Sequence, residues 1–168
     1  MVLIKSELLA LLQSEVRILL HLAGKIDRTK LDYRPTPKQR STIELLKYLS
    51  VMGPNMVRYA LTGEFDRDAY QAASKLAAER DFDQTLAVIA THTDTYAALL
   101  ADVSDADFRV EFSAFDGAKT TRGAFIVNLV VGGCAAYRTQ LFLYLKACGR
   151  DELSTTNLWG GVDPPPAT

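Results

Sequence analysis

The chain has few of the residues that usually build a metal or redox centre: only two histidines and two cysteines among 168 residues. It also lacks a surplus of either charge, since 19 Lys and Arg oppose 20 Asp and Glu. The basic residues are spread along the chain, whereas a nucleic-acid-binding domain usually gathers them into a patch. The sequence therefore predicts no nucleic-acid partner. It also predicts no membrane span, because no run reaches about 18 uncharged apolar residues.

The two cysteines and the N-terminus give the same indication of compartment. Cys134 and Cys148 fall on one predicted helix, too far apart along a rigid rod to form a disulfide. The apolar residues 1–22 resemble a signal sequence, but charged side chains interrupt them and no small-residue cleavage site follows. We therefore predict a single cytoplasmic domain with reduced thiols, which fits a composition of 48% hydrophobic and 23% charged residues.

Apolar spacing and capping signals predict the helices. Ser6 can cap a first helix that ends near Ile26, and capping boxes at 41–44 and 81–84 open the second and third core helices. The apolar seam of the second helix consists of Leu45, Leu49, Met52, Met56 and Ala60. Gly53-Pro54 falls inside this helix, where we expect a kink or short break. Residues 68–80 have a thin apolar face and predict a short helix outside the bundle.

The last long helix, residues 128–149, is the most apolar part of the chain and is expected to be its spine. Its predicted inward face consists of Ile126, Leu129, Val130, Gly133, Ala136, Tyr137, Gln140 and Tyr144. Before it, Phe108, Val110 and Phe112 alternate with polar residues and Asp116-Gly117 is a turn signal, so a short strand should cross the bundle or pair in a hairpin.

These elements predict an all-α four-helix bundle with a short extra helix and an extended or hairpin segment before the last helix. The bundle should comprise residues 1–153 as one domain. Residues 154–168 should form an extended tail because of the prolines at 164–166. The single tryptophan, Trp159, is expected to dock this tail on the body or on a second subunit.

Two segments resemble the DinB/YfiT-like superfamily of four-helix bundles. They are the proline-bearing entry into the second helix, RPTPKQRSTIELLKYLSVMG at 34–53, and the end of the last helix, YRTQLFLYLKACG at 137–149. The resemblance implies a site in which one histidine of the second helix and two of the last, four residues apart, hold a divalent metal. Some relatives use such a metal for thiol-dependent transfer or isomerisation.

The positions that match those ligands here are Tyr48, Gly133 and Tyr137, and none is a histidine. Glycine offers no side-chain ligand, and a tyrosine with a pKa near 10 is a poor ligand for zinc or nickel at neutral pH. The last helix contains no histidine in any register. We therefore predict no metal and no cofactor.

The candidate site at the former metal position consists of Tyr48, Gly133, Cys134, Tyr137, Gln140 and Tyr144. Three interpretations remain open. The small residues can let helices pack closely while tyrosines hydrogen-bond across the gap, or the tyrosines can line a small-molecule pocket. Cys134 can also act as a nucleophile if the charge of Arg138 reaches its sulfur. Under close packing, Gly133→Leu should destabilise the fold by about 1–3 kcal/mol.

The histidines, His21 and His92, lie on other helices. His21 is interpreted as a surface residue, and His92 as half-buried and hydrogen-bonded, or as a catalytic or metal-binding group. The function predicted from these observations is a small-molecule-binding or interaction protein, homodimeric as relatives often are. The alternative is a thiol-dependent S-transferase or isomerase with a displaced site.

Overall fold

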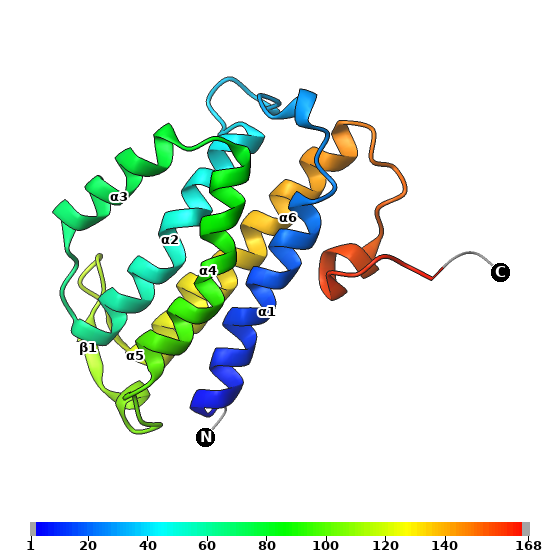
Figure 1. Cartoon of the computed structure of the whole chain (residues 1–168). Coiled ribbons are helices and arrows are strands. Elements are labelled where there is room, and N and C mark those ends of the chain that lie inside the picture. Colours follow the sequence, from blue (N-terminus) through cyan, green and yellow to red (C-terminus); the bar gives the residue numbers. More distant parts are fainter. Residues whose placement is uncertain (1–2, 166–168) are drawn as a thin grey trace.

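Four long helices form the body of the protein in the computed structural model, which describes residues 3–165 (Figure 1). They are α1 (Lys5–Ala23), α2 (Thr42–Thr62), α4 (Phe82–Leu100) and a last continuous helix, Arg122–Ala147. α1 and α2 each contact both α4 and the last helix. The predicted all-α bundle is confirmed, and α3 (Arg67–Glu79) lies outside it against α2, with only Ala77 buried.

Both predicted capping boxes are present. In α2, the Glu44 N–H donates to Ser41 Oγ (3.4 Å) and the Ser41 N–H donates to Glu44 Oε2 (2.8 Å). In α4, the Gln84 N–H donates to Asp81 Oδ1 (2.8 Å) and the Asp81 N–H donates to Gln84 Oε1 (3.0 Å). These side chains satisfy N–H groups that have no partner inside the helix, which fixes where each helix begins.

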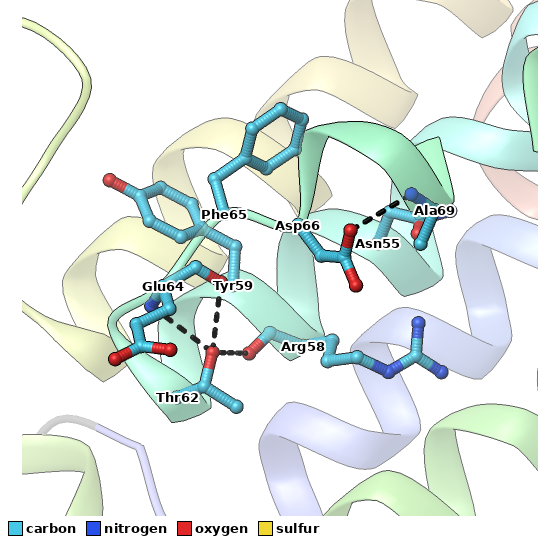
Figure 2. A pocket seen from close by; sticks show the side chains of 8 residues that line it. All are labelled: Asn55, Arg58, Tyr59, Thr62, Glu64, Phe65, Asp66 and Ala69. Carbon is cyan, nitrogen blue, oxygen red and sulfur yellow. Dashed lines mark hydrogen bonds between the residues drawn. The ribbon is translucent and has the colours of Figure 1, made fainter. Parts of the chain in front are cut away.

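α2 ends at Gly63, which takes the left-handed conformation (φ 79°) and lets the chain turn into α3. Asp66 then caps α3 by accepting a hydrogen bond from the Ala69 N–H at 2.8 Å (Figure 2). The connection is short because each end carries its own stop or start signal.

The predicted start and end of α1 are wrong. α1 begins one residue before Ser6, with Ile4 as its N-cap residue and the Ile4 N–H bound to Glu7 Oε2 at 2.9 Å. It ends at Ala23 rather than near Ile26. α2 runs through Gly53 and Pro54 as one helix, so the short break, one of the two predicted alternatives, is absent.

The segment before the last helix is a small hairpin, as one of the two predicted alternatives stated. β1 (Glu111–Ser113) pairs antiparallel with β2 (Lys119–Thr121), and Phe112 lies opposite Thr120. Gly117 at the turn has φ 79°, as a glycine turn requires. A 3₁₀ turn, Asp107–Arg109, precedes the hairpin and buries Phe108.

The last helix changes its geometry part-way along its length. It consists of α5 (Arg122–Phe125), a π-helical segment Ile126–Val131, and α6 (Gly132–Ala147). A π-turn holds one more residue than an α-turn, so it rotates everything after it by roughly 100° relative to a regular helix.

The predicted inward face of this helix is therefore wrong beyond the π-helical segment. Ile126 and Val130 are buried as expected, but Leu129 within the segment is already 37% exposed. After the segment, Ala136 is exposed and Gly133 is only half-buried. The residues buried after the π-helical segment are Arg138, Leu141, Tyr144 and Leu145. Except for Tyr144, they stand one position beyond the predicted face.

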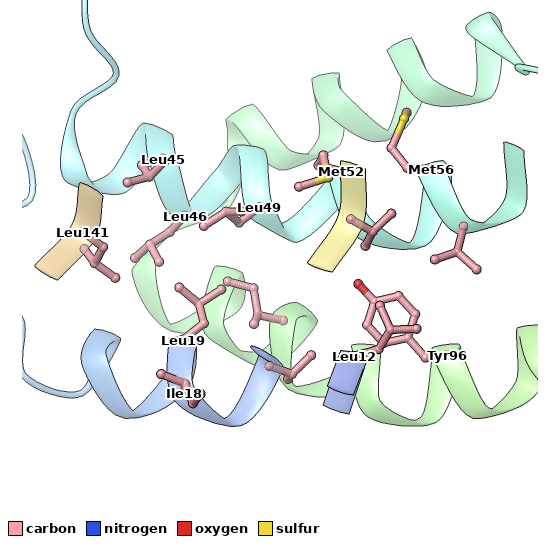
Figure 3. Close-up of a cluster of buried hydrophobic side chains, with 14 of the residues drawn as sticks. Leu12, Ile18, Leu19, Leu45, Leu46, Leu49, Met52, Met56, Tyr96 and Leu141 are labelled. Atoms are coloured by element: carbon pink, nitrogen blue, oxygen red, sulfur yellow. The ribbon is translucent and has the colours of Figure 1, made fainter. Parts of the chain in front are cut away.

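The apolar core runs through the length of the bundle (Figure 3). Its fully buried side chains are Leu12, Leu22, Leu45, Leu46, Val57, Ile89, Tyr96, Leu100, Ile126, Val130 and Leu141. All members of the predicted α2 seam, Leu45, Leu49, Met52, Met56 and Ala60, are buried. Burial of such side chains is the main force that holds helices together.

The C-terminal segment folds back on α1 instead of extending freely. Residues Thr156–Gly160 form a short π-helical turn where an extended chain was expected. Asn157 is buried, while Trp159 is 68% exposed and offers one face to the guanidinium of Arg138 at 5.4 Å. Of the three prolines at 164–166, the last lies outside the described residues.

One helix, Arg122–Ala147, is long and apolar enough to cross a bilayer by length and composition, with a mean hydropathy of 1.3. Core helices of globular proteins meet the same criterion, and this one packs against α1 and α2. Only 22% of its apolar window is buried inside the described part of the chain.

Candidate functional site

The structure divides the six candidate residues among three places. Tyr48, Gly133 and Tyr137 lie together at a hollow between α2 and α6. Gln140 and Tyr144 lie at a neighbouring hollow one to two turns along α6. Cys134 lies close to Glu15 and Tyr96.

The hollow between α2 and α6 has a volume of about 390 Å³, and we call it the α2–α6 hollow. Its lining consists of Tyr48, Met52, Met56, Tyr70, Phe115, Leu129, Gly133, Ala136 and Tyr137. The Tyr48 and Tyr137 rings meet edge to face, with their centroids 5.1 Å apart. None of these lining side chains carries a charge, so the walls are apolar surface with tyrosine hydroxyls as the polar groups.

Gly133 keeps this hollow open. A Cβ added there would meet only Met52 Cε, at the ordinary contact distance of 3.4 Å. The glycine is not a close contact between helices, so the overpacking expected for Gly133→Leu lacks its cause. The new side chain would enter the α2–α6 hollow instead.

The Tyr48 hydroxyl stays protonated in this setting. Burial, together with the neighbouring Tyr137 hydroxyl, raises the pKa of Tyr48 well above its usual value of 10.0. A neutral phenol can donate and accept hydrogen bonds but cannot supply a phenolate to a metal. The α2–α6 hollow therefore presents uncharged walls near neutral pH.

Gln140 and Tyr144 are engaged elsewhere. The Tyr144 hydroxyl donates to the Arg40 carbonyl at 2.9 Å, Gln140 Nε2 donates to the same hydroxyl, and the Tyr33 ring packs against Tyr144 with centroids 5.5 Å apart. The neighbouring hollow, of about 540 Å³, shares only Ala136 with the first. These two residues therefore fasten the linker before α2 to α6.

The structure gives Cys134 the character of a buried thiol. Burial and, to a smaller extent, the Glu15 carboxylate raise its pKa to about 12, and the charge of Arg138 only partly opposes them. A cysteine reacts as a thiolate, and nucleophilic cysteines have lowered pKa values. At neutral pH Cys134 is thus protonated and packed against the core.

Arg138 is a buried charged residue, and the helical period of the sequence did not predict its burial. Its guanidinium lies 3.3 Å from the Glu15 carboxylate, and the two side chains are 5% and 12% exposed. Burial raises the pKa of Glu15, while Arg138 lowers it. The π-helical segment is the cause, since it turns Arg138 toward α1 in place of Tyr137.

Comparison with solved structures identifies the architecture. The chain is similar to a DinB-like protein, YjoA, from Bacillus subtilis, with 22% identity, a TM-score of 0.66, and coverage of 88% of this chain and 94% of that one. The fold is DinB-like. No family model and no curated protein matches the chain.

Within the DinB-like fold, the three positions that the resemblance assigns to metal ligands do meet in space. Tyr48 comes from α2, and Gly133 and Tyr137 come from α6 on adjacent turns. Across residues 3–165, no group of three His, Cys, Asp or Glu side chains is arranged to hold a metal ion. The chemistry at this position belongs to phenol, thioether and aromatic groups.

His92 has a structural partner in this fold. It is 5% exposed, more deeply buried than expected, and its Nε2 lies 3.1 Å from the Ser50 carbonyl oxygen. That carbonyl would normally accept the N–H of residue 54, but Pro54 has none. Because a carbonyl only accepts, Nε2 must carry the proton, and His92 supplies the hydrogen bond that Pro54 cannot.

Burial lowers the pKa of His92 to about 4, and the Ser50 carbonyl only partly opposes this. The side chain is therefore neutral at pH 7. The signal that could have revealed this role was the proline inside α2, which leaves one carbonyl in need of a donor.

His21 faces the C-terminal segment rather than solvent. Its Nε2 lies 3.1 Å from Asn157 Nδ2 and 3.8 Å from the Asp163 carboxylate. Asn157 Nδ2 also donates to Asp163 Oδ1 at 2.9 Å. The interpretation of His21 as a surface residue is therefore wrong: it helps to hold the chain end on α1.

Proposed function

We propose that this protein binds a small molecule in the α2–α6 hollow, at the position where the DinB-like resemblance expects a metal, and that it does so without a metal. One observation carries this proposal. Tyr48, Gly133 and Tyr137 line a hollow of about 390 Å³, and the edge-to-face contact of the two tyrosine rings does not fill it. Ligand pockets typically fall between roughly 300 and 1,000 Å³ and have mostly apolar walls with a few polar groups.

The main competing function, thiol-dependent transfer or isomerisation, needs an activated thiol or a metal that activates one. The pKa of about 12 at Cys134 disfavours the first requirement. Phenols at two of the three positions and a glycine at the third are poor zinc ligands. These properties support binding over thiol chemistry at this site.

Two neighbouring glycines allow a direct test. Gly133→Leu places a side chain in the α2–α6 hollow, whereas Gly132→Leu projects from an exposed position whose nearest foreign atom is the Val127 carbonyl at 3.5 Å. Both changes remove a helical glycine, so their effects on helix propensity cancel. Ligand-detected NMR with a library of small aromatic compounds should find binders that Gly133→Leu abolishes and Gly132→Leu keeps.

If both leucine variants bind the compounds equally well, the binding site lies outside this hollow and the proposal is overturned. Metal analysis of the purified protein gives an independent check. We expect no stoichiometric zinc or nickel, and one tightly bound equivalent of either would contradict a metal-free site.

A further inference from the structure

The α2–α6 hollow adjoins a second hollow of about 350 Å³, and the rings of Tyr48 and Tyr70 line both. The walls of the second hollow are also mostly apolar, but three charged residues line it, whereas none lines the first. These residues are Arg40, Glu44 and Lys47, from the start of α2 and the chain just before it. A molecule in the apolar hollow that extended past the shared rings would therefore come within reach of these charged groups.

Of these three charged groups, Arg40 is the one whose head group has no ionic or hydrogen-bond partner among residues 3–165. Glu44 accepts from the Ser41 N–H and lies 3.3 Å from Arg34 Nη2. Lys47 Nζ donates to the Ala78 carbonyl at 2.7 Å. Within the same described range, no carboxylate pairs with Arg40.

The Arg40 guanidinium is nonetheless held in place. Its central carbon lies 4.0 Å from the centroid of the Tyr48 ring, a cation–π arrangement at the border between the two hollows. An arginine stacked on an aromatic face still presents its N–H groups in the plane of the guanidinium. That fork matches the two oxygens of a carboxylate.

The lining of the α2–α6 hollow determines what kind of group the uncharged part of the ligand can be. Its walls are the thioethers of Met52 and Met56 and the rings of Tyr70, Phe115 and Tyr137. Methionine adapts to irregular shapes and packs well on aromatic rings, and the aromatic side chains offer both faces and edges. Such walls favour a flat or branched apolar body.

We propose that the ligand is a small carboxylate with an aromatic or apolar body. The body occupies the α2–α6 hollow and the carboxylate pairs with Arg40 beside Tyr48. This inference rests on the proposed function and names the class of its ligand.

The test uses 2-naphthoate and its uncharged analogue 2-naphthamide as probes, with affinity measured by isothermal titration calorimetry. The intact protein should bind the carboxylate about tenfold more tightly, as expected for one charge-assisted hydrogen-bond pair at a partly exposed site. Arg40→Gln should weaken 2-naphthoate to the level of 2-naphthamide and leave the amide unchanged. Arg40→Lys, which keeps the charge but not the fork, should retain part of the preference.

Arg58→Gln is the matched control. Arg58, within α2, is another exposed arginine without a carboxylate partner among the described residues, but it lines a separate hollow near the start of α3 (Figure 2). Its substitution should change neither affinity.

The outcomes separate the two proposals. If both probes bind equally in the intact protein, or if Arg40→Gln and Arg58→Gln behave alike, the carboxylate class is wrong while binding in the hollow stands. If neither probe binds, the carboxylate class is wrong as well. If Gly133→Leu leaves 2-naphthoate binding intact, the proposed function itself fails.

Discussion

The two sides of α2 differ sharply in how they meet their neighbours. On the side of α4, Gly53 lies against the Tyr96 hydroxyl so closely that a Cβ there would sit 2.0 Å from the oxygen. His92 of α4 completes the backbone bonding of the same helix. On the side of α6, Gly133 faces a hollow and two tyrosines meet only edge to face.

The comparison shows that small residues do not define a site by themselves. Gly53 and Gly133 are both helical glycines at a helix–helix boundary. The Tyr96 ring fills the space beside Gly53, whereas Gly133 borders the α2–α6 hollow. What differs is the partner helix. α4 sends a tyrosine and a histidine toward α2, whereas α6 turns its long inward side chain, Arg138, toward Glu15 of α1.

The largest effect should come from the residue that holds α6 to α1. Arg138→Met removes the partner of a carboxylate that is 12% exposed, and loss of one member of a buried pair typically costs about 3–5 kcal/mol. We expect a loss of about 3 kcal/mol in the free energy of unfolding, measured by urea denaturation. The double variant Glu15→Met with Arg138→Met should recover most of it, and a double variant as unstable as the single one would show that the pair is not the cause.

On the side of α2 that faces α4, the free energy of unfolding should depend on pH. His92 has a pKa of about 4 when folded and an ordinary value of 6.5 when unfolded, so the unfolded chain binds a proton between these values while the folded one does not. This contribution to stability is complete above pH 6.5 and is lost as the pH falls toward 4, by about 3 kcal/mol in total. The comparison of wild type with His92→Phe isolates it from other groups that titrate in this range.

The same variant tests the link to Pro54. In the Pro54→Ala background, the restored N–H can bond to the Ser50 carbonyl, so His92→Phe should cost less there than in the wild type. If the effects of Pro54→Ala and His92→Phe on the free energy of unfolding simply add, His92 does not replace the missing N–H of Pro54.

The two glycines give the smallest but most direct comparison. Gly53→Ala forces its Cβ against a buried ring, and after the gain in helix propensity we expect a net loss of about 2 kcal/mol. Gly133→Ala should be neutral or stabilise the fold by up to about 1 kcal/mol, because its nearest neighbour lies at 3.4 Å. Thermal denaturation of both variants measures the difference.

Tyr96→Phe provides the check on this mechanism. It removes the offending hydroxyl and leaves the ring carbon 3.3 Å from the Cβ that an alanine at position 53 would add, so it should rescue Gly53→Ala substantially. If Gly133→Ala proves as harmful as Gly53→Ala, the two sides of α2 do not differ as described.

Local signals in the sequence predicted the parts of the fold that depend on local chemistry. The capping residues at 41–44 and 81–84, the apolar seam of α2 and the Asp116-Gly117 turn all act within a few residues. The positions of Tyr48, Gly133 and Tyr137 relative to one another came from the resemblance. The homodimer and the cytoplasmic location stay predictions.

The remaining features depend on contacts that no local pattern encodes. The π-helical segment Ile126–Val131 has no proline or other marker, so a regular period placed Gln140 at the site and Arg138 away from the core. The C-terminal turn forms because Asn157 and Asp163 meet His21 across more than a hundred residues. The role of His92 could not be chosen from the sequence, because it depends on the Ser50 carbonyl to which His92 donates.

The π-helical segment has one more consequence, for the length of the chain. Its six residues are equivalent to a regular helix with a single residue inserted, so a deletion of one exposed residue such as Asn128 would return the segment to α-helical winding. Every side chain from 132 to 147 would keep its present direction, because the deletion removes the one residue that the π-turn accommodates. If the same six residues wound as a regular α-helix with no deletion, everything after them would turn by about 100°, and Tyr137 in place of Arg138 would face α1. The π-helical turn therefore lets a chain of this length bring Arg138 to Glu15 and leave Tyr137 beside the α2–α6 hollow.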